Sequence, residues 1–168
     1  MEKINTKKFV IILILISLLV SITGCGGNDK LTKEELSELT DDEINVVNEY
    51  YKNQKIINKV KDELYAIDCD DISLYYLDNK IKTTYNIYIN EHENLKKYTS
   101  KYFQKFQGEP TPEIWYRELF GDKVVEFSFY DHQQKAVIGL LYTEKPEIHS
   151  QIIKKIDDNW YLFIFHTY

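Results

Sequence analysis

Lys154-Lys-Ile-Asp-Asp-Asn-Trp-Tyr-Leu162 is the stretch that decides the fold. Its centre, Asp157-Asp158-Asn159, is a turn sequence between two apolar runs, and it predicts a hairpin of residues 148–156 and 160–168. Large apolar residues occupy both faces of the second strand: Trp160, Leu162 and Ile164 on one, and Tyr161, Phe163 and Phe165 on the other. We expect such a strand to lie inside a sheet or to be covered on both sides.

The segments before this hairpin alternate with the period of β-strands. One strand is predicted around Val125, Phe127 and Phe129, followed by a turn at 131–134. The next strand continues through alternate residues until Pro146 closes it: Ala136, Ile138, Leu140 and Tyr142. An earlier hairpin is predicted from 72–77 and 81–89, with its turn at 78–80. Its second strand has a shared face: Ile81, Thr83, Tyr85, Ile87 and Ile89.

Two capping boxes predict the first helices. Thr32 with Glu35, and Thr40 with Glu43, place an N-cap hydroxyl three residues before a carboxylate. We therefore expect a short helical turn and then a long helix from Asp41 to about residue 64. The long helix has an apolar seam with Asn53 as a gap: Val46, Tyr50, Ile57, Val60 and Leu64. That seam spans too few heptads for a coiled coil, so it predicts packing on a sheet.

A second helix is predicted from an N-cap at Asn90, with Glu93 at the capping-box position, to a C-terminal cap at Gly108. Its apolar face comprises Leu95, Tyr98, Tyr102, Phe103 and Phe106, and its solvated basic face Lys96, Lys97, Lys101 and Lys105. Residues 112–120 favour a third, shorter helix, because Pro112 suits a first helical position. A strand is the alternative there, since Gly121-Asp122 suits a hairpin turn.

The order is a long N-terminal helix, a β-hairpin, one or two helices, and a four-stranded antiparallel portion: one α+β domain over residues 31–168. This order resembles the cystatin-like cone of ketosteroid isomerase and nuclear-transport-factor proteins, and the 154–162 stretch is similar to the last hairpin of small secreted lipoproteins of that fold. The resemblance implies a curved sheet around the long helix. Enzymes of the family carry an acidic base and a Tyr or Asp oxyanion donor inside the cone, but no residue here matches these one by one.

The N-terminus resembles the lipoprotein class of bacterial signal peptides. Lys3, Lys7 and Lys8 precede the 14-residue apolar run 9–22, which at about 1.5 Å per residue reaches roughly 21 Å, short of a bilayer core. Ile22-Thr-Gly-Cys25 reads as a lipobox. The resemblance implies cleavage between Gly24 and Cys25, with lipid on Cys25. Residues 1–24 are then a signal peptide and 25–30 a tether reaching about 20 Å. The alternative is an ordinary signal peptide or membrane anchor with an incidental cysteine.

The net charge of the chain argues against some classes of binding partner. The whole chain has a net charge of −6, and loss of residues 1–24 leaves it near −8. This acidity argues against nucleic acid and against lying flat on anionic lipid. Cys69 would be the single unmodified cysteine, so no internal disulfide is expected. Arg117 is the only arginine among 21 basic residues, a bias that suggests an AT-rich, Gram-positive source.

The chemical candidates in the sequence are incomplete. His92-Glu93 begins like a zinc-protease helix, but Lys96 stands in place of the second histidine. The run 68–71 lacks the glycine and glutamate of a calcium loop, with Ser73 and Asn79 at those positions, and favours a solvated acidic turn. Cys69 could pair with a histidine as nucleophile and base, or be a small buried hydrophobe. The histidines in question are His132, His149 and His166. We expect no catalytic residue, metal or cofactor.

A pocket, if present, would be lined by aromatic residues of the sheet face and the second helix. The candidates are Tyr85, Tyr98, Tyr102, Phe103, Phe127 and Phe129. The same residues would equally suit a plain core.

These observations favour a bacterial surface lipoprotein on the extracytoplasmic face of the cell membrane, acting as a binding or interaction module. Its partners would be the lipid bilayer, through acylated Cys25, and a protein or small molecule, with no nucleic acid. One alternative is a small-ligand-binding or enzymatic domain of the cone fold. Another is a protective or accessory lipoprotein of a mobile element.

Overall fold

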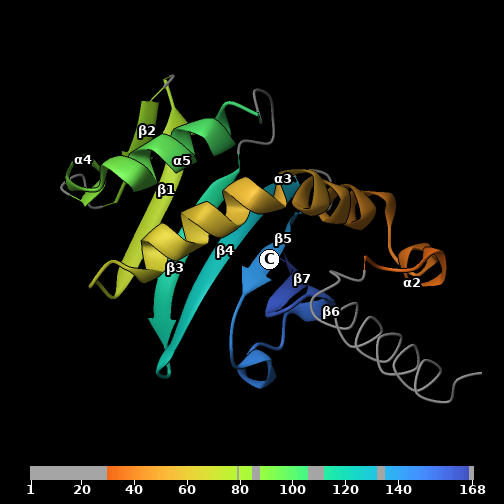
Figure 1. Cartoon of the computed structure of the whole chain (residues 1–168). Coiled ribbons are helices and arrows are strands. Elements are labelled where there is room, and N and C mark those ends of the chain that lie inside the picture. The colour runs from red at the N-terminus through yellow and green to blue at the C-terminus, as the bar shows by residue number, and fades with distance from the viewer. Residues whose placement is uncertain (1–29, 79, 85–87, 106–111, 132–134, 167–168) are drawn as a thin grey trace, which may run out of the picture.

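The computed structural model describes residues 30–78, 80–84, 88–105, 112–131 and 135–166. The chain forms an α+β structure in which helices pack on an antiparallel sheet (Figure 1). Its helices are α2 (Lys33–Ser37), α3 (Asp41–Tyr65), α4 (Tyr88–Glu91), α5 (Glu93–Phe103) and the 3-10 helix η1 (Pro146–Ile148). No helix in the described part is long and apolar enough to cross a membrane.

Seven strands form a single antiparallel sheet in the order β2-β1-β3-β4-β5-β7-β6. They are β1 (Asp71–Leu77), β2 (Lys80–Thr83), β3 (Glu113–Leu119), β4 (Asp122–Asp131), β5 (Ala136–Tyr142), β6 (Ile152–Asp157) and β7 (Trp160–His166). β7 pairs with both β5 and β6, and its residues 160–163 are buried on both faces. The interior position predicted for this strand is therefore confirmed.

The long helix begins and ends close to the predicted residues. Thr40 accepts a hydrogen bond from the backbone of Glu43, and the Glu43 carboxylate accepts one from the backbone of Thr40. Thr32 and Glu35 form the same capping box at the start of α2. Both boxes satisfy backbone N–H groups that a helix N-terminus leaves unpaired. The predicted seam is buried, and the gap residue Asn53 is buried with it.

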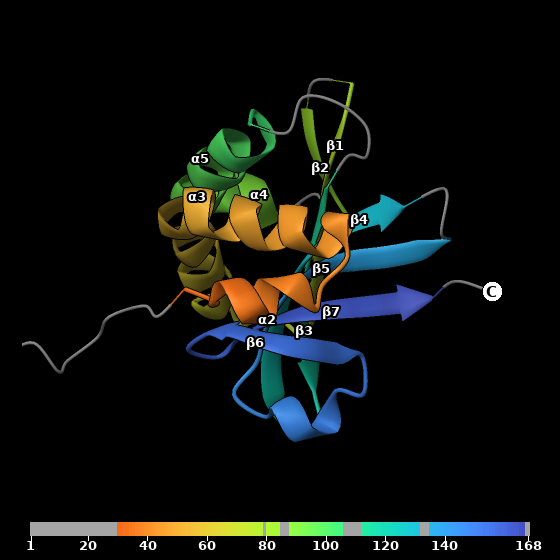
Figure 2. The same ribbon diagram turned by 90° about the vertical axis from the view of Figure 1, so that its right-hand side faces the viewer.

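The main core lies between α3, α5 and one face of the sheet. α3 crosses β4, β5 and β7, and α5 lies beside α3 and against β2 (Figures 1 and 2). The largest fully buried side chains of this main core are aromatic: Trp160, Tyr50, Tyr102, Tyr116, Phe103 and Phe127. A smaller cluster lies on the other sheet face: Val124, Leu141, Tyr161 and Phe163.

Residues 113–119 form strand β3, not the predicted third helix, so the strand alternative is correct. β3 pairs with β1 on one side and β4 on the other, which buries Ile114 and Tyr116 completely. Phe120 and Gly121 adopt φ angles of 52° and 71° in the turn that follows. The sheet therefore has seven strands where the sequence predicted six.

Three other predicted boundaries are wrong. The strand expected over 81–89 ends at Thr83, and Ile89 lies buried in α4; Tyr85 and Ile87 lie outside the described residues. Asn90 lies inside α4, so it is not the N-cap of the next helix; His92 occupies that position without a side-chain capping bond. α5 ends at Phe103 with Gln104 as its C-cap, before Gly108, which is itself outside the described residues.

Candidate functional site

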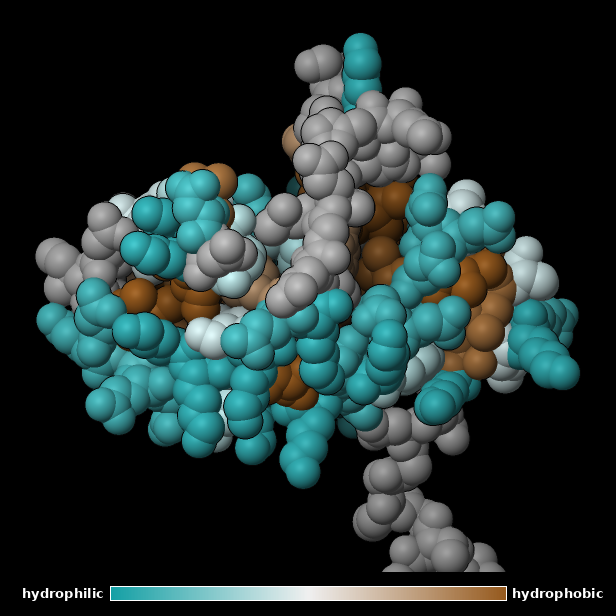
Figure 3. Space-filling model, turned by 90° about the horizontal axis from the view of Figure 1, so that it is seen from above, coloured by the Kyte–Doolittle hydropathy of each residue, from teal (hydrophilic) through white to brown (hydrophobic). Residues whose placement is uncertain are grey.

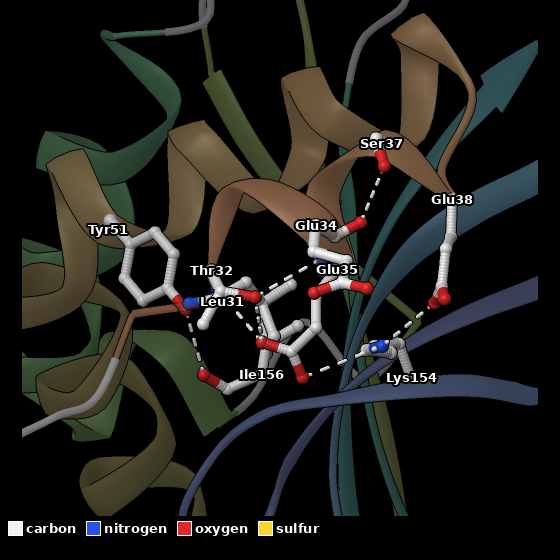
Figure 4. A network of polar contacts seen from close by, with 9 residues as sticks. All are labelled: Leu31, Thr32, Glu34, Glu35, Ser37, Glu38, Tyr51, Lys154 and Ile156. Atoms are coloured by element: carbon white, nitrogen blue, oxygen red, sulfur yellow. Dashed lines mark hydrogen bonds and ion pairs between the residues drawn. The ribbon is translucent and has the colours of Figure 1, made fainter.

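The first described residues lie against the middle of α3 (Figure 4). The backbone N–H of Leu31 donates a 3.0 Å hydrogen bond to the hydroxyl of Tyr51, which itself donates to the carbonyl of Ile156 at 3.0 Å. The ammonium group of Lys30 lies 5.5 Å from the centroid of the Tyr51 ring. Cys25 and Gly24 lie outside the described residues. The fold thus holds the chain in place within six residues of Cys25.

Helix α2, which follows these residues, is joined to strand β6 by ion pairs (Figure 4). Lys154 on β6 lies 3.2 Å from a carboxylate oxygen of Glu38 and 3.6 Å from one of Glu35. Hydrogen bonds from the backbone and hydroxyl of Thr32 lower the pKa of Glu35, and Lys154 lowers it further. These contacts are exposed, so they orient α2 on β6 more than they stabilise the fold.

The residues expected to line a pocket pack in the core. Tyr102, Phe103 and Phe127 are at most 1% exposed. The ring centroid of Tyr102 lies 5.6 Å from that of Phe103 and 5.1 Å from that of Phe127, both in edge-to-face geometry. Tyr98 and Phe129 are partly buried against the same cluster, and Tyr85 lies outside the described residues. The structure therefore gathers most of these candidates into one aromatic cluster in the core.

Cys69 is a free, half-buried cysteine that packs against the main core. Burial raises the pKa of its thiol, and the carboxylates of Asp70 and Asp71 raise it further. The thiol is therefore protonated at neutral pH, and a thiol in that state is a poor nucleophile. This environment agrees with the interpretation of Cys69 as a small hydrophobe.

Two of the three histidines considered as possible bases for Cys69 lie within the described residues. His149 Nε2 lies 3.6 Å from Asp122 Oδ2, with both side chains at most 8% exposed. The same carboxylate oxygen accepts a hydrogen bond from the hydroxyl of Thr143. The hydroxyl of Thr143 therefore donates to the carboxylate and not to the imidazole. His166 is exposed at the end of β7, and His132 lies outside the described residues.

This buried group of Asp122, Thr143 and His149 was not found from the sequence. Asp122 starts β4, Thr143 follows β5, and His149 follows η1, so the three meet only where these strand ends lie side by side. Their spacing matches no motif.

The remaining chemical candidates are surface groups. Asp68, Asp70 and Asp71 are exposed before and at the start of β1. His92 makes no side-chain capping bond at the start of α5. Within the described ranges, no group of three or more His, Cys, Asp or Glu side chains is arranged to hold a metal ion.

A surface of lysines covers the outer side of the two long helices. We define the α3–α5 lysine surface as Lys52, Lys55 and Lys59 from α3 with Lys97, Lys101 and Lys105 from α5 and its end; all six are exposed. The two helices are joined where Lys105 Nζ donates to Asn53 Oδ1 at 2.6 Å and where Lys59 Nζ lies 4.9 Å from the ring centroid of Tyr98.

One large apolar side chain stands out at the β3–β4 turn. Phe120 is 89% exposed, in a turn that Lys145 holds by donating from Nζ to the carbonyl of Gly121 at 3.0 Å. Seen from above, the face of the molecule is mostly hydrophilic, with hydrophobic residues in smaller patches (Figure 3). Contact groups of both kinds, cationic and apolar, are therefore present at the surface.

Comparison of the chain with protein-family models, curated proteins and solved structures found no match.

Proposed function

We propose that the chain is a bacterial surface lipoprotein, tethered to the extracytoplasmic face of the cell membrane through acylated Cys25, whose folded domain is a binding or interaction module. The proposal assigns no catalytic residue. It includes a cystatin-like cone as the fold, which the position of α3 across one face of the antiparallel sheet supports.

The observation that supports the lipid tether is the lipobox at residues 22–25, and the hydrogen bond from Leu31 to Tyr51 marks where the tether joins the folded domain. Six residues from Cys25 to Lys30 reach at most about 20 Å. The folded domain would therefore stay beside the lipid headgroups, and two acyl chains would hold it there durably.

Binding through the surface is supported by where the aromatic candidates lie. Tyr102, Phe103 and Phe127 are taken up by contacts with one another and the core. Side chains available to a partner include those of the α3–α5 lysine surface and Phe120. Aromatic side chains are enriched in protein interfaces, and complementary charge steers partners together.

The tether is tested by lipid labelling of the two cysteine variants. Cys25→Ser should incorporate no fatty acid and should accumulate as uncleaved precursor. Cys69→Ser is the matched control, since Cys69 is partly buried in the folded domain, and it should be labelled and cleaved like the parent. A Cys25→Ser chain that is cleaved normally and stays on the membrane would refute the proposal.

A further inference from the structure

The α3–α5 lysine surface is depleted of acidic residues in a chain that has an excess of them. Residues 50–61 and 94–105 contain eight lysines and neither Asp nor Glu, although the whole chain has 27 acidic residues. In the fold these two segments lie side by side, because residue 53 contacts residue 105 and residue 59 contacts residue 98. Positive charge is thus concentrated on one outer side of an acidic protein.

The lysine ammonium groups on this surface are largely unneutralised. Lys52 pairs with Glu49 at 3.0 Å, and Glu49 also accepts a hydrogen bond from Asn53. Among the described residues, no carboxylate lies within 4.0 Å of the ammonium groups of the other five lysines. The other acidic residues of these helices lie toward their ends: Asp41, Asp42, Glu43, Asp62, Glu63 and Glu93.

The start of the described chain lies at the edge of the same surface. Lys30 lies over the ring of Tyr51, and Lys55 follows Tyr51 by one helical turn on α3. A tether of about 20 Å from this point would keep the lysines close to whatever surface holds Cys25.

We propose that the α3–α5 lysine surface docks on the anionic headgroups of the membrane to which the domain is tethered. This inference rests on the proposed lipid anchor. Lysine ammonium groups are compact, mobile point charges that suit diffuse headgroups, whereas arginine suits fixed bidentate sites. Clusters of four to eight basic residues beside a membrane anchor bind anionic lipid in this way. The net charge predicted the opposite, because it averages over charges that the fold separates.

The docking orients the domain. With the lysine surface toward the bilayer, the outer sides of α3 and α5 face lipid, and the acidic remainder of the chain is turned away from the negative membrane. A single tether without docking would leave the domain free to tumble. Anchor and lysine surface together act as two signals, which bind a membrane more firmly than either alone.

The test uses the full chain, purified with its anchor and reconstituted into vesicles of phosphatidylcholine alone or with added phosphatidylglycerol. Acetylation of each lysine is measured by mass spectrometry. We expect labelling of the lysine surface to fall about threefold or more with phosphatidylglycerol, while the exposed Lys80 and Lys155 react equally in both. Salt at about 1 M should remove the difference, because the Debye length is then about 3 Å.

Charge variants separate docking from general electrostatics. In Lys55→Gln with Lys101→Gln, the remaining lysines of the surface should lose most of their protection. Lys80→Gln with Lys155→Gln changes the net charge equally and should leave the protection intact. Equal labelling in the two vesicle types, or equal loss in both variants, would overturn the inference.

Two further results of this experiment would overturn the inference for different reasons. Protection by soluble polyphosphate on phosphatidylcholine vesicles, without protection by phosphatidylglycerol, would assign the surface to an anionic polymer and overturn the lipid assignment. Release of the chain from both vesicle types by a wash at about 1 M salt would show that the anchor itself is absent. That result refutes the proposed function, and the docking that depends on it falls too.

Discussion

The hydroxyl of Tyr50 donates a 2.6 Å hydrogen bond to Asp157 Oδ2 and so joins the middle of α3 to the β6–β7 turn, 107 residues away. Gln54 donates to the same oxygen at 2.5 Å, and the backbone of Asp158 donates to the other carboxylate oxygen at 2.8 Å. One turn further along α3, Asn58 accepts a 2.9 Å bond from the indole of Trp160. The turn that the sequence predicts locally is thus tied to the helix by polar contacts.

Removing the Tyr50 hydroxyl should loosen this connection. We expect Tyr50→Phe to lower the free energy of unfolding by about 1–2 kcal/mol, because the partly buried carboxylate of Asp157 loses one donor. Tyr75→Phe is the matched control, since no described residue hydrogen-bonds to the Tyr75 hydroxyl, and it should change stability by less than about 0.5 kcal/mol. Urea unfolding followed by circular dichroism measures both. Equal effects of the two substitutions would contradict this role of Tyr50.

Buried tyrosines should make the fold sensitive to alkali. Burial raises the pKa of Tyr50, Tyr65 and Tyr102, and the Asp157 carboxylate raises that of Tyr50 further. Below about pH 10 these groups are protonated in both the folded and the unfolded chain, so their contribution to stability is complete. Above that pH the unfolded chain loses its protons first, and the free energy of unfolding should fall as the pH rises.

This alkaline loss can be measured by urea unfolding between pH 8 and about 11, with ionisation followed by absorbance near 295 nm. The slope should reach about 1.4 kcal/mol per pH unit for each tyrosine that keeps its proton only in the folded chain. Tyr50→Phe and Tyr65→Phe should each flatten it. Tyrosines that all ionise near pH 10 in the folded chain would contradict the prediction.

Gly139 should tolerate no side chain. A Cβ at this position would lie 2.3 Å from the carbonyl oxygen of Phe127 and 2.8 Å from the ring of Phe163. We expect Gly139→Ala to lower the free energy of unfolding by about 1–3 kcal/mol, because strands β4, β5 and β7 would have to shift. Gly121→Asn is the control, since a Cβ at Gly121 would make only an ordinary contact, 3.7 Å from Lys145 Nζ, and Asn accepts its positive φ. A Gly139→Ala chain as stable as the control would show that the register can adjust.

The thiol of Cys69 should react slowly in the folded chain. Burial raises its pKa, so the thiolate fraction at pH 8 is smaller than in an exposed cysteine. Iodoacetamide should modify it about tenfold or more faster in urea than in buffer, as measured by mass spectrometry. Equal rates would mean that the thiol is freely exposed in solution.

Features set by neighbouring residues could be predicted from the sequence. The capping boxes at Thr32 and Thr40 are present, because each needs only a hydroxyl and a carboxylate three residues apart. The turn at 157–159 and the interior position of β7 follow from residues next to one another. Lys96, Lys97 and Lys101 on α5, and Lys105 just after it, are exposed as expected.

The errors occur where local signals conflict with distant contacts. Pro112 suits a helix start, yet β3 forms because pairing with β1 and β4 buries Ile114 and Tyr116. The capping pair of Asn90 and Glu93 is overridden, since residues 88–91 form a helix of their own that buries Ile89. In both cases burial of large apolar side chains outweighs a local preference worth about 1 kcal/mol.

For the candidate site, the sequence supplies the kinds of residue and the structure supplies their grouping. The aromatic candidates Tyr102, Phe103 and Phe127 were equally compatible with a pocket or a core, and only ring-to-ring packing places them in the core. The cluster of Asp122, Thr143 and His149 depends on strand ends that meet through the register of β4 and β5.

By itself the sequence determined the starts of α2 and α3, the main turns, most of the alternating strands and the α+β class, because hydrogen bonds and side-chain periodicity within a few residues specify them. The lipid anchor also remains a prediction from sequence, at Cys25. The tertiary structure alone decided that β3 is a strand, that Tyr50 binds Asp157, and that the lysines of α3 and α5 form one surface. These features depend on contacts between segments far apart in the chain. Such contacts stabilise the protein only once the core between those segments has formed.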